Sequence, residues 1–481
     1  MSDPTTLLSA RKQAIRARTE RQASERLAWI ARNAYYYEED HRYLRFLVPP
    51  GLKVLELGCG VGHNLAALMP ARGVGVDFSA AALAVARAQH PGYEYHLGDV
   101  EDPATLDGLD GPFDVILLSD TIGELEDCQA TLANLHRLAT RDTRIIISYY
   151  STMWEPLLKI GEWLGRKMPQ EPQNWLSTED IMALLDLAGF EAVKREWRQL
   201  LPRRLLGLGP LVNRFIATLP LIRRLCLRNY VVARPRPKEP LGNLSATVLI
   251  PCRNERGNIE PAVLRLPRFA EDLEIIFVEG GSEDGTREEI ERVIAAHPEH
   301  RMRLLIQDGK GKGDAVRKGF AEAQGDVLII LDADLTVPPE WIPHFYEAVR
   351  SGRGEFINGS RLVYPMEDQA MRFLNLAANR VFSWLFSWLL NQRLTDTLCG
   401  TKVLRKRHYE RIVANRAYFG EFDPFGDFDL IFGAAKLNLK VVEVPVRYAS
   451  RRYGETQISR FRHGWLLLRM VLFAFRKLKA F

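Results

Sequence analysis

A proline-rich stretch near the middle of the chain limits the folds that its 481 residues can adopt. Pro235, Pro237 and Pro240 interrupt this stretch, and proline is excluded from helix interiors and from central strands. Arginine and lysine alternate with these prolines. We therefore expect a semi-extended linker over residues 235–242, with a separate domain on each side. The alternative is a proline-rich surface loop within one domain.

The length and the cysteine pattern narrow the class of protein. A chain of this length exceeds what one hydrophobic core supports, so about two to four domains are expected. The five cysteines are scattered and lack CxxC spacing, which indicates reduced thiols in a cytosol and not a disulfide framework or a zinc site. The start of the sequence has no apolar signal-like region, and no apolar run reaches about 18 residues, so we expect neither a secretory signal nor a membrane-spanning helix.

The net charge of +5 is unevenly distributed. Between Arg198 and Lys238 there are ten lysines or arginines and no acid, and no acid follows Glu455. Both stretches alternate these cations with large apolar residues, which suits an anionic membrane surface better than a nucleic acid. The stretch near 200–228 is thus expected to be a basic amphipathic insertion that touches lipid or the second domain. A solvated basic face is the alternative.

The first half alternates strand and helix patterns. Apolar strands are expected at 54–57, 73–76, 93–96, 114–118 and 143–149, with two closing strands at 190–197 and 229–233. Helices are expected between them. This alternation predicts an α/β domain over residues 1–234, built on an open parallel sheet with helices on both faces.

A glycine-rich turn, Gly58–Gly62, follows the first of these strands. Glycines at a strand-to-helix turn let the backbone approach a ligand beyond the carboxyl end of the strand. Glu56 lies in that strand, Asp77 ends the second, where it can accept from both ribose hydroxyls, and Asp99 follows the third, where it can accept from an adenine amino group. A nicotinamide dinucleotide would favour a glycine where this chain has His63.

The segments VLELGCGVG, VGVD, GDV and FDVILLSD resemble the class I S-adenosylmethionine-dependent methyltransferases in order and spacing, over roughly residues 35–234. The resemblance implies a Rossmann-like fold and a cofactor site made by Glu56, Gly58, Gly60, Gly62, Asp77, Asp99 and Val100. Methyl transfer from a sulfonium can proceed by alignment without a universal base, so the methyl acceptor stays open. Asp120, Tyr149 and Tyr150 lie where acceptor-side residues are expected, although ordinary packing also explains the tyrosines.

The second half carries a pair of carboxylates at the end of a buried strand. Strands are expected at 246–251, 275–278, 303–306 and 326–331, and the last runs directly into Asp332-Ala333-Asp334. Two carboxylates two residues apart offer hard oxygen ligands that suit magnesium or manganese bridging a diphosphate. Such a metal neutralises the charge that builds on a departing nucleoside diphosphate. The alternative is an acidic surface turn.

This half resembles the inverting family 2 glycosyltransferases of GT-A fold, and among them the polyprenyl- or dolichyl-phosphate sugar synthases. PCRNERGNI, GKGDAVRKGF, DADLTVPPEW, DTLCGTKVLRK and EVPVRY match in order over residues 246–460, within a domain expected at 243–481. The resemblance implies a metal held by Asp332 and Asp334 and acids near the acceptor at Asp427 and Asp429. It also implies contacts to a nucleotide-diphosphate sugar from Pro251, Asn254, Glu255, Glu279, Asp284, Lys312 and Asp332.

Departures from the family pattern leave the donor sugar and the acceptor open. The second strand ends in Glu279-Gly280 where two aspartates are usual, Thr336 replaces a polar metal ligand, and residues 454–457 lack an expected lysine. A lipid phosphate acceptor is already an anion and would be bound by arginines, for which Arg361, Arg372 and Arg451 are the candidates. Surface ion pairs are the alternative for these arginines. A hydroxyl acceptor would need Asp427 or Asp429 as a base.

Two further segments, near 373–390 and 461–479, combine apolar residues with a narrow polar or basic stripe. Interfacial helices are expected there, with buried core helices as the alternative. The sequence thus predicts a bifunctional enzyme, peripheral on the cytoplasmic face of a membrane, that uses S-adenosylmethionine and transfers a sugar to a polyprenyl phosphate. A glycosyltransferase acting on a saccharide hydroxyl is one alternative. A non-catalytic N-terminal docking module is another.

Overall fold

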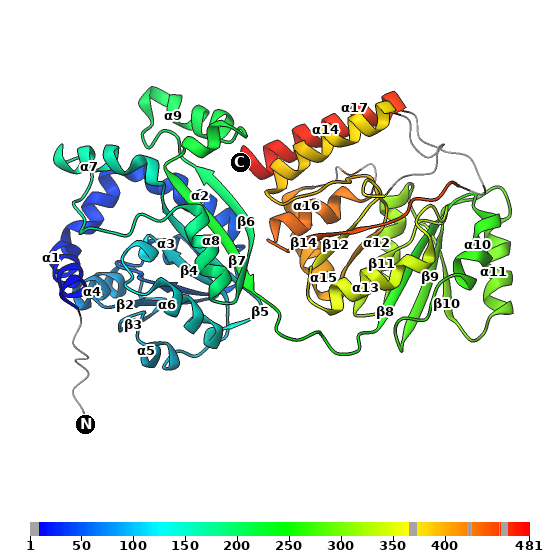
Figure 1. Cartoon of the computed structure of the whole chain (residues 1–481), viewed down its shortest axis with the longest axis horizontal. Coiled ribbons are helices and arrows are strands. Elements are labelled where there is room, and N and C mark those ends of the chain that lie inside the picture. Colours follow the sequence, from blue (N-terminus) through cyan, green and yellow to red (C-terminus); the bar gives the residue numbers. More distant parts are fainter. Residues whose placement is uncertain (1–8, 365–372, 421–422, 424–425, 452, 454–459) are drawn as a thin grey trace. The chain divides into compact units, whose positions relative to one another are not determined.

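The computed structural model describes residues 9–364, 373–420, 423, 426–451, 453 and 460–481. The chain divides into two compact units between Arg236 and Pro237, inside the segment where a linker was expected. The last strand of the first unit continues to Pro235. Each unit is built on its own seven-stranded sheet (Figure 1).

The first unit has a mixed sheet in the order β3-β2-β1-β4-β5-β7-β6. The strands are β1 (Lys53–Leu57), β2 (Arg72–Asp77), β3 (Glu94–Leu97), β4 (Phe113–Ser119), β5 (Ala139–Tyr150), β6 (Phe190–Arg198) and β7 (Arg228–Pro235). The first five strands pair in parallel, as expected. β7 instead runs antiparallel to both β5 and β6, so the sheet is mixed and not wholly parallel. An antiparallel neighbour needs no crossover helix, and the segment between β6 and β7 is therefore free to form the insertion.

The helices of this unit are α1 (Ala10–Arg32), α2 (Ala34–Leu47), α3 (His63–Leu68), α4 (Ala80–Gln89), α5 (Pro103–Asp107), α6 (Cys128–Asn134), α7 (Glu155–Trp163), α8 (Thr178–Leu187) and α9 (Leu208–Leu211). Polar caps fix several of them: Ser79 begins α4 by accepting from Ala82 N, and Ser177 and Asp180 form a reciprocal capping box on α8. Four successive residues of β1 are buried, so the helices cover both faces of the sheet.

The second unit has the sheet order β10-β9-β8-β11-β13-β12-β14. Its strands are β8 (Ala246–Cys252), β9 (Leu273–Glu279), β10 (Arg301–Ile306), β11 (Val327–Ile330), β12 (Phe356–Ser360), β13 (Lys402–Arg405) and β14 (Val441–Pro445). β8 lies between β9 and β11 and is parallel to both, whereas β13 is antiparallel to β11 and β12. The core on one side of this sheet contains Val248, Phe277 and Ile329.

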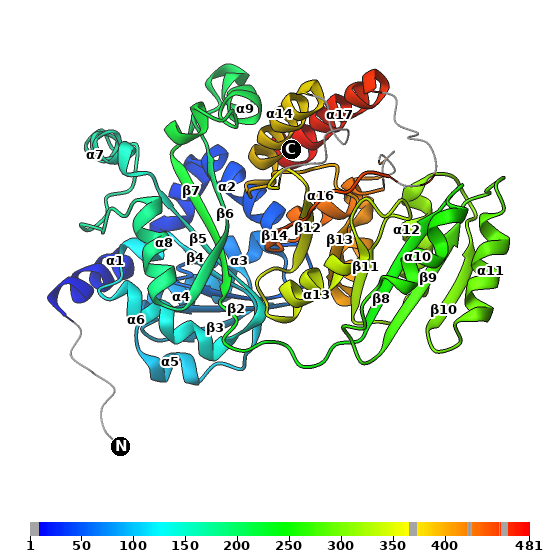
Figure 2. The ribbon, with the colours of Figure 1, turned by 45° about the vertical axis from the view of Figure 1, so that its right-hand side comes forward.

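The helices of the second unit are α10 (Ile259–Leu264), α11 (Thr286–Ala296), α12 (Lys312–Glu322), α13 (Ile342–Arg350), α14 (Phe373–Leu390), α15 (Lys406–Ala414), α16 (Phe428–Lys436) and α17 (Arg460–Ala474). α14 and α17 lie side by side in both views (Figures 1 and 2). Within the described ranges, no helix is both long and apolar enough to cross a membrane.

The two apolar segments of the second unit form helices with a particular orientation. On α14, Ser383 and Ser387 donate to Leu394 O at 2.7 and 3.0 Å, so the polar stripe of this helix faces its own domain. Val381 and Trp384 are instead exposed. On α17, Trp465 and Leu472 are exposed as well. The side chain of Arg462, part of the expected basic stripe, lies outside the described residues.

We predict that residues 1–236 and 237–481, expressed separately, each unfold in a single cooperative thermal transition. The physical reason is that each unit has its own sheet and its own buried core. Differential scanning calorimetry with far-UV circular dichroism checks this. If either half is insoluble or melts without cooperativity, while the full chain melts normally, the halves depend on each other for folding.

Candidate functional sites

A cavity of about 200 Å³ opens at the carboxyl edge of the first sheet. Its lining includes Gly58, Gly60, Asp77, Asp99 and Val100, five of the residues expected to bind a cofactor. The carboxyl ends of parallel strands meet at one edge, and this is why residues from three strand ends converge there. The structure thus brings these predicted residues together around one space.

The glycine turn after β1 is shaped for close approach. Gly58, Gly60 and Gly62 have φ angles of 71°, 51° and 74°, a region that favours glycine. A β-carbon at Gly58 would lie 2.5 Å from Oγ1 of Thr121, so a side chain cannot be accommodated there. Gly62 does not line the cavity and instead begins α3. The turn therefore leaves room for a ligand where a larger residue would block it.

Asp77 is held by backbone groups. Its two carboxylate oxygens accept from Gly60 N at 2.8 Å and from Ser79 N at 2.9 Å. Burial raises the pKa of Asp77 above its usual value, and these two hydrogen bonds oppose that rise. The carboxylate is thereby fixed at the end of β2, in the wall of the cavity. Such a position fits a carboxylate that receives hydrogen bonds from ribose hydroxyls.

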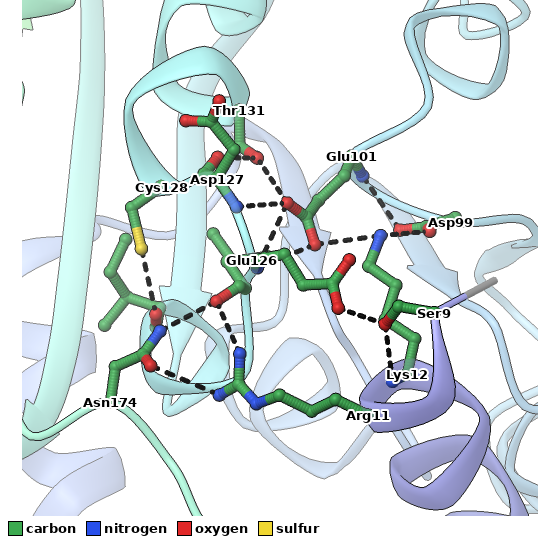
Figure 3. Close-up of polar contacts among 12 residues, drawn as sticks. Ser9, Arg11, Lys12, Asp99, Glu101, Glu126, Asp127, Cys128, Thr131 and Asn174 are labelled. Atoms are coloured by element: carbon green, nitrogen blue, oxygen red, sulfur yellow. Dashed lines mark hydrogen bonds and ion pairs between the residues drawn. The ribbon is translucent and has the colours of Figure 1, made fainter.

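Asp99 is paired with a cation from the N-terminal helix. The Lys12 ammonium on α1 forms ion pairs with Asp99 and, at 2.9 Å, with Glu101 (Figure 3). The other oxygen of Asp99 accepts from Glu101 N. A ligand amino group at Asp99 would therefore share this carboxylate with Lys12 or displace it. Lys12 lies far from the glycine turn in the sequence, and no local motif predicted this contact.

Glu56 differs from expectation. Its side chain does not line the cavity, because its oxygens accept from Asn64 Nδ2 at 3.0 Å and from Leu65 N at 3.1 Å. Burial raises the pKa of Glu56 to about 8, against the effect of these two donors. Glu56 therefore fixes the start of α3 behind the glycine turn. Its partner Asn64 does line the cavity.

The acceptor-side candidates lie on a buried charge network. Asp120 has a φ of 62°, and its carboxylate is bound by the guanidinium of Arg228, which is fully buried. Arg228 also donates to Asp40 Oδ1 at 3.2 Å and to Ser148 Oγ at 3.1 Å. A non-glycine residue in this backbone region is strained and is held by its surroundings, as at many functional sites. Asp120 lines the cavity, and its ion pair with Arg228 fixes its carboxylate.

The two tyrosines have different surroundings. Tyr150 stacks on Tyr36, and their hydroxyls are 3.1 Å apart, next to the cavity wall that Tyr36 forms. Tyr149 is buried and donates to Thr178 Oγ1 at 2.9 Å. The environment of Tyr149 is thus that of a packed core residue, whereas Tyr150 adjoins the cavity.

Sequence reasoning missed Glu124 and the role of His63. Glu124 lines the cavity, and among the described residues none donates a hydrogen bond to its carboxylate. Burial, together with the charges of Asp77 and Asp120, raises the pKa of Glu124 to about 7. His63 also lines the cavity, and burial lowers its pKa well below the usual value, so its ring is neutral. Asp77, which acts on Glu124, is far from it in the sequence, so no local motif pointed to this raised pKa.

In the second unit, a lysine joins two predicted carboxylates. Nζ of Lys312, at the start of α12, lies 2.7 Å from Asp332 Oδ1 and 3.4 Å from Asp427 Oδ1. Burial opposes charge on the lysine, but the carboxylates of Asp332 and Asp427 raise its pKa. Burial likewise opposes ionisation of Asp332, yet Lys312 holds the pKa of that carboxyl below its ordinary value. Burial raises the pKa of Asp427.

The surroundings of Asp332 fit a metal-diphosphate site. A β-carbon at Gly400 would lie only 1.8 Å from Asp332 Oδ2, so a glycine is required to leave that oxygen accessible. Asp334 provides a second carboxylate two residues on. This set of hard oxygen donors matches what magnesium and manganese prefer. Asp332 and Asp334 are therefore the residues that would hold the ion.

Asp334 is also compensated by a cation. The Arg451 guanidinium lies 2.8 Å from Asp334 Oδ2 and 3.1 Å from Glu255 Oε1. It thus joins the aspartate pair to the loop that follows β8. Thr336 donates to Asp334 Oδ1 at 2.7 Å. A metal at Asp334 would share this carboxylate with Arg451. Arg451 was expected to bind an acceptor phosphate. To do so, it would have to leave Glu255 or Asp334.

The residues predicted to bind the nucleoside lie on two adjacent loops, one after β8 and one after β9. Asn254, just after β8 and its residue Pro251, accepts from Glu283 N at 2.9 Å. Glu279 ends β9 and accepts from Ser282 N. Asp284 accepts from Thr286 N, and Tyr453 donates to it at 3.3 Å. β8 and β9 are parallel neighbours, so these loops lie at the same sheet edge as Asp332.

Two candidates are engaged elsewhere. Arg361 forms a bidentate pair with Asp396, at 2.6 and 2.8 Å, and its guanidinium lies over the ring of Tyr448. Asp429 pairs with Arg416 at 2.9 Å, away from Lys312. Arg361 is thus held by Asp396 while it also acts electrostatically on Asp332, and an acceptor phosphate at Arg361 would have to share it with Asp396. The third arginine, Arg372, lies outside the described residues.

Two further residues of this region were not predicted. The Asp396 carboxylate is completely buried, and although burial acts against it, Arg361 holds its pKa below the ordinary value. Lys402 is also completely buried, donates to Cys399 O, and acts electrostatically on Asp332 and Asp427. Both lie in the segment DTLCGTKVLRK, but sequence order alone did not separate the structural residues from those facing a ligand.

Comparison with known families decides the identity of each unit. Residues 27–195 match the family described as methyltransferase domain, and residues 247–413 match glycosyl transferase family 2. The chain joins a methyltransferase domain to a family 2 glycosyltransferase domain. Both resemblances drawn from the motifs are therefore confirmed at the level of the family. The glycine turn and Asp77 lie in the first matched range, and Asp332 and Asp334 lie in the second.

Individual proteins match one domain each. A dolichol-phosphate mannosyltransferase of Pyrococcus furiosus is 30% identical over 221 residues, which cover 45% of this chain and 60% of that protein. The chain thus spans less than two thirds of this relative. A possible histamine N-methyltransferase structure from Thermotoga maritima has a TM-score of 0.37 at 21% identity, covering 46% of this chain and 99% of its own. Glucosyl-3-phosphoglycerate synthase from Mycobacterium tuberculosis has a TM-score of 0.36 at 16% identity, covering 49% and 78%.

We predict that Arg361→Ala destabilises the glycosyltransferase domain by about 3–5 kcal/mol at pH 7, because it leaves the buried Asp396 carboxylate unpaired. The paired carboxylate has a lowered pKa, so its contribution is present above the unfolded pKa of about 3.9 and is lost as the pH falls through the folded value. The difference from the original protein should therefore shrink in acid. Urea unfolding at a series of pH values measures it. Arg287→Ala, at an exposed ion pair, is the control and should change little.

Proposed function

We propose that the chain is a bifunctional enzyme. Its glycosyltransferase domain transfers a sugar from a nucleotide-diphosphate sugar to a polyprenyl phosphate with inversion, in a metal-dependent reaction. Its methyltransferase domain transfers a methyl group from S-adenosylmethionine. The observation that carries the first activity is the group of Asp332, Asp334, Lys312 and Asp427 at one sheet edge. The dolichol-phosphate mannosyltransferase name of the relative supports a lipid phosphate acceptor.

A lipid acceptor places this enzyme at a membrane surface, on the cytoplasmic side. The orientation of α14 supports this, because its serines bond inward to Leu394 while Val381 and Trp384 face outward. On α17, Trp465 and Leu472 are exposed beside Arg469. Exposed apolar side chains flanked by arginine are typical of helices that lie in the interface of an anionic bilayer. We propose that α14 and α17 contact lipid as peripheral elements.

The sugar transfer follows from the positions of these residues. An oxygen of the acceptor phosphate attacks the anomeric carbon, and the bond from that carbon to the nucleoside diphosphate breaks with its electron pair on the diphosphate. A divalent cation, when bound, neutralises the negative charge of that leaving group. Lys312 lies at Asp332, where its ammonium stabilises the same developing charge. A phosphate acceptor is already ionised, so this reaction needs no general base.

A saccharide hydroxyl is the second candidate acceptor, and Asp427 is the observation that favours it. A hydroxyl must lose its proton during attack, and Asp427 is a buried carboxyl with a raised pKa beside Lys312. The proton would move to its carboxylate oxygen. Extraction of the labelled product into organic solvent separates the two acceptors, because a polyprenyl phosphate sugar partitions there and a free glycan does not.

We predict that Asp334→Asn lowers sugar transfer by about a hundredfold or more, because it removes a carboxylate ligand at the diphosphate. Transfer from a panel of radiolabelled nucleotide sugars to organic-extractable lipid, measured with and without manganese, checks this. Asp272→Asn is a matched control, since Asp272 is exposed at the amino end of β9 and pairs only with Arg301 among the described residues. Unchanged transfer in Asp334→Asn would refute the role of the aspartate pair.

For the methyltransferase domain, the cavity at the glycine turn carries the proposal. S-adenosylmethionine supplies an electrophilic methyl group on a sulfonium. Asp77 would receive the ribose hydroxyls, the Gly58–Gly62 turn would admit the methionine end, and Asp99 with Val100 would flank adenine. Intact glycine and carboxylate positions favour catalysis over a purely structural docking module. Glu124 and Asp120 add two carboxylates to the same cavity, where a positive sulfonium is stabilised.

We predict that the affinity for S-adenosylmethionine, relative to neutral S-adenosylhomocysteine, rises as the pH increases from 6 to 8. Glu124 has a pKa of about 7, so it gains negative charge in this range and favours the sulfonium by roughly fivefold, about 1 kcal/mol. Taking the ratio of the two affinities cancels pH effects on the contacts that both ligands share. Calorimetric titration measures it.

Glu124→Gln should flatten this pH profile, although Asp77, Asp120, Arg26 and Arg11 also act on the site. Glu126→Gln is the control, because Glu126 is exposed and does not line the cavity. If the affinity ratio of the Glu124 variant changes with pH as steeply as that of the original protein, Glu124 is not the group that favours the sulfonium. Absence of any heat with S-adenosylmethionine would instead reject cofactor binding itself.

A further inference from the structure

Exposed apolar side chains are concentrated on one part of the methyltransferase domain. Of the 27 large apolar side chains exposed among the described residues, 14 lie on two segments, residues 153–164 and 205–225. Trp163 is 84% exposed, Leu221 is 89% exposed and Leu206 is fully exposed. We call these two segments together the apolar rim. Contiguous exposed apolar surface of this kind marks an interaction site.

The two segments of the apolar rim are joined to each other. Trp154 Nε1, just before α7, donates to Leu225 O at 2.9 Å, and Ser151 N donates to Leu227 O at 2.8 Å. α7 and α9 lie at the same end of the methyltransferase domain in both views (Figures 1 and 2). The first segment follows the carboxyl end of β5, and the second follows that of β6. The rim therefore surrounds the same sheet edge at which the cofactor cavity opens.

The rim also continues into the wall of that cavity. Met168 and Gln170, which follow α7 closely, line it. The second segment is bonded to α2, because Asn213 donates to the Tyr35 hydroxyl at 2.9 Å. Gln199, which precedes this segment at the end of β6, donates to Tyr36 O. Tyr36 itself lines the cavity. A molecule held against the rim would thus have its polar end close to the cavity.

Charge on the rim identifies the kind of partner. Residues 203–224 contain five arginines and no acid, and Arg203, Arg204 and Arg224 are exposed. Large apolar side chains between arginines suit a surface that is both anionic and able to take up hydrocarbon, which is the surface of a bilayer with acidic lipids. A folded acidic protein would supply the charge but not a fluid apolar phase for side chains that project singly.

The backbone at the tip of the rim supports a functional origin. Leu205 and Leu206 have φ angles of 43° and 55°, which are strained for bulky side chains. Leu206 projects fully into solvent, where no packing of its side chain offsets this cost. Contact with an apolar phase would offset it. An exposed turn without a partner would more readily carry glycine or asparagine.

We propose that the apolar rim docks the methyltransferase domain onto an anionic lipid surface, and that its methyl acceptor is a lipid whose polar headgroup reaches the cavity from that surface. This deepens the proposed methyltransferase function and rests on it. In the reaction the headgroup oxygen or nitrogen bonds to the methyl carbon, the carbon–sulfur bond breaks with its electron pair on sulfur, and the headgroup proton leaves to a carboxylate of the cavity or to water.

Vesicle flotation of the full chain tests the docking. The probes are vesicles of phosphatidylcholine alone and vesicles of phosphatidylcholine mixed with phosphatidylglycerol. The variant Trp163→Ser/Leu206→Ser/Leu221→Ser should bind the mixed vesicles about tenfold more weakly, since each side chain contributes apolar burial in the interface. Trp384→Ser/Trp465→Ser measures the share of α14 and α17 separately. Equal binding to neutral vesicles, or no loss in the triple variant, overturns the proposal.

A matched control lies on the same domain. Met69→Ser/Leu97→Ser/Leu187→Ser replaces three exposed apolar side chains outside the rim and should leave vesicle binding unchanged. Circular dichroism and calorimetric titration with S-adenosylmethionine verify that both triple variants are folded. If the rim variant changes the sedimentation of the free protein and not its vesicle binding, the rim covers a second copy or the other domain, and the proposal is wrong.

The acceptor class has its own readout. The Asp334→Asn protein, in which sugar transfer is expected to be strongly reduced, is incubated with tritiated S-adenosylmethionine and vesicles of total membrane lipid. The label should enter the organic phase, and the rim variant should transfer several-fold less at limiting vesicle concentration. Label that stays in the aqueous phase, from a protein that binds the cofactor, overturns the lipid acceptor. No cofactor binding in any variant rejects the methyltransferase function instead, and the flotation result still decides the docking.

Discussion

Parallel pairing of the central strands determines where both sites of this chain can lie. β1 lies between β2 and β4, and β8 lies between β9 and β11, all in parallel. At each of these places the strand order reverses direction, which opens a crevice beyond the carboxyl ends. The glycine turn occupies one crevice and the aspartate pair the other. Two unrelated chemistries thus use the same geometric consequence of a parallel sheet.

Within each crevice, carboxylates are held in two ways that differ in their consequence for a ligand. Among the described residues, Asp77 accepts from backbone N–H groups and is not paired with a cation, so its position does not depend on a mobile side chain. Asp99 and Asp332 are instead neutralised by lysines, and Asp334 by an arginine. Pairing a partly buried carboxylate with a cation reduces the cost of burying its charge. A bound cation or donor must then share or replace that partner, which makes ligand binding an exchange of partners.

The sequence carried the local parts of this description and missed those that depend on distant contacts. The strand patterns, the glycine turn and Asp332-Ala333-Asp334 are local signals: in the structure Gly58 and Gly60 line a cavity, and Asp332 follows β11. The antiparallel β7 was not foreseen, because strand direction is set by pairing and not by composition. The pairing of Arg361 with Asp396, 35 residues later, was not foreseen either. Glu56 reads as a cofactor residue but bonds to α3.

Both domains expose large apolar side chains, and the packing within each domain does not account for this exposure. In water, an amphipathic helix turns its apolar side inward, because burial of that side drives its packing. α14 departs from this in part: it buries Phe386 and Leu389, but Ser383 and Ser387 are also bonded inward while Trp384 is exposed. In the methyltransferase domain, Leu206 is likewise exposed on a strained turn. Each domain thus exposes large apolar side chains, on an arginine-rich segment in the methyltransferase domain and on α14 in the glycosyltransferase domain. An apolar phase with negative charge at its boundary is the environment in which both arrangements lower the free energy.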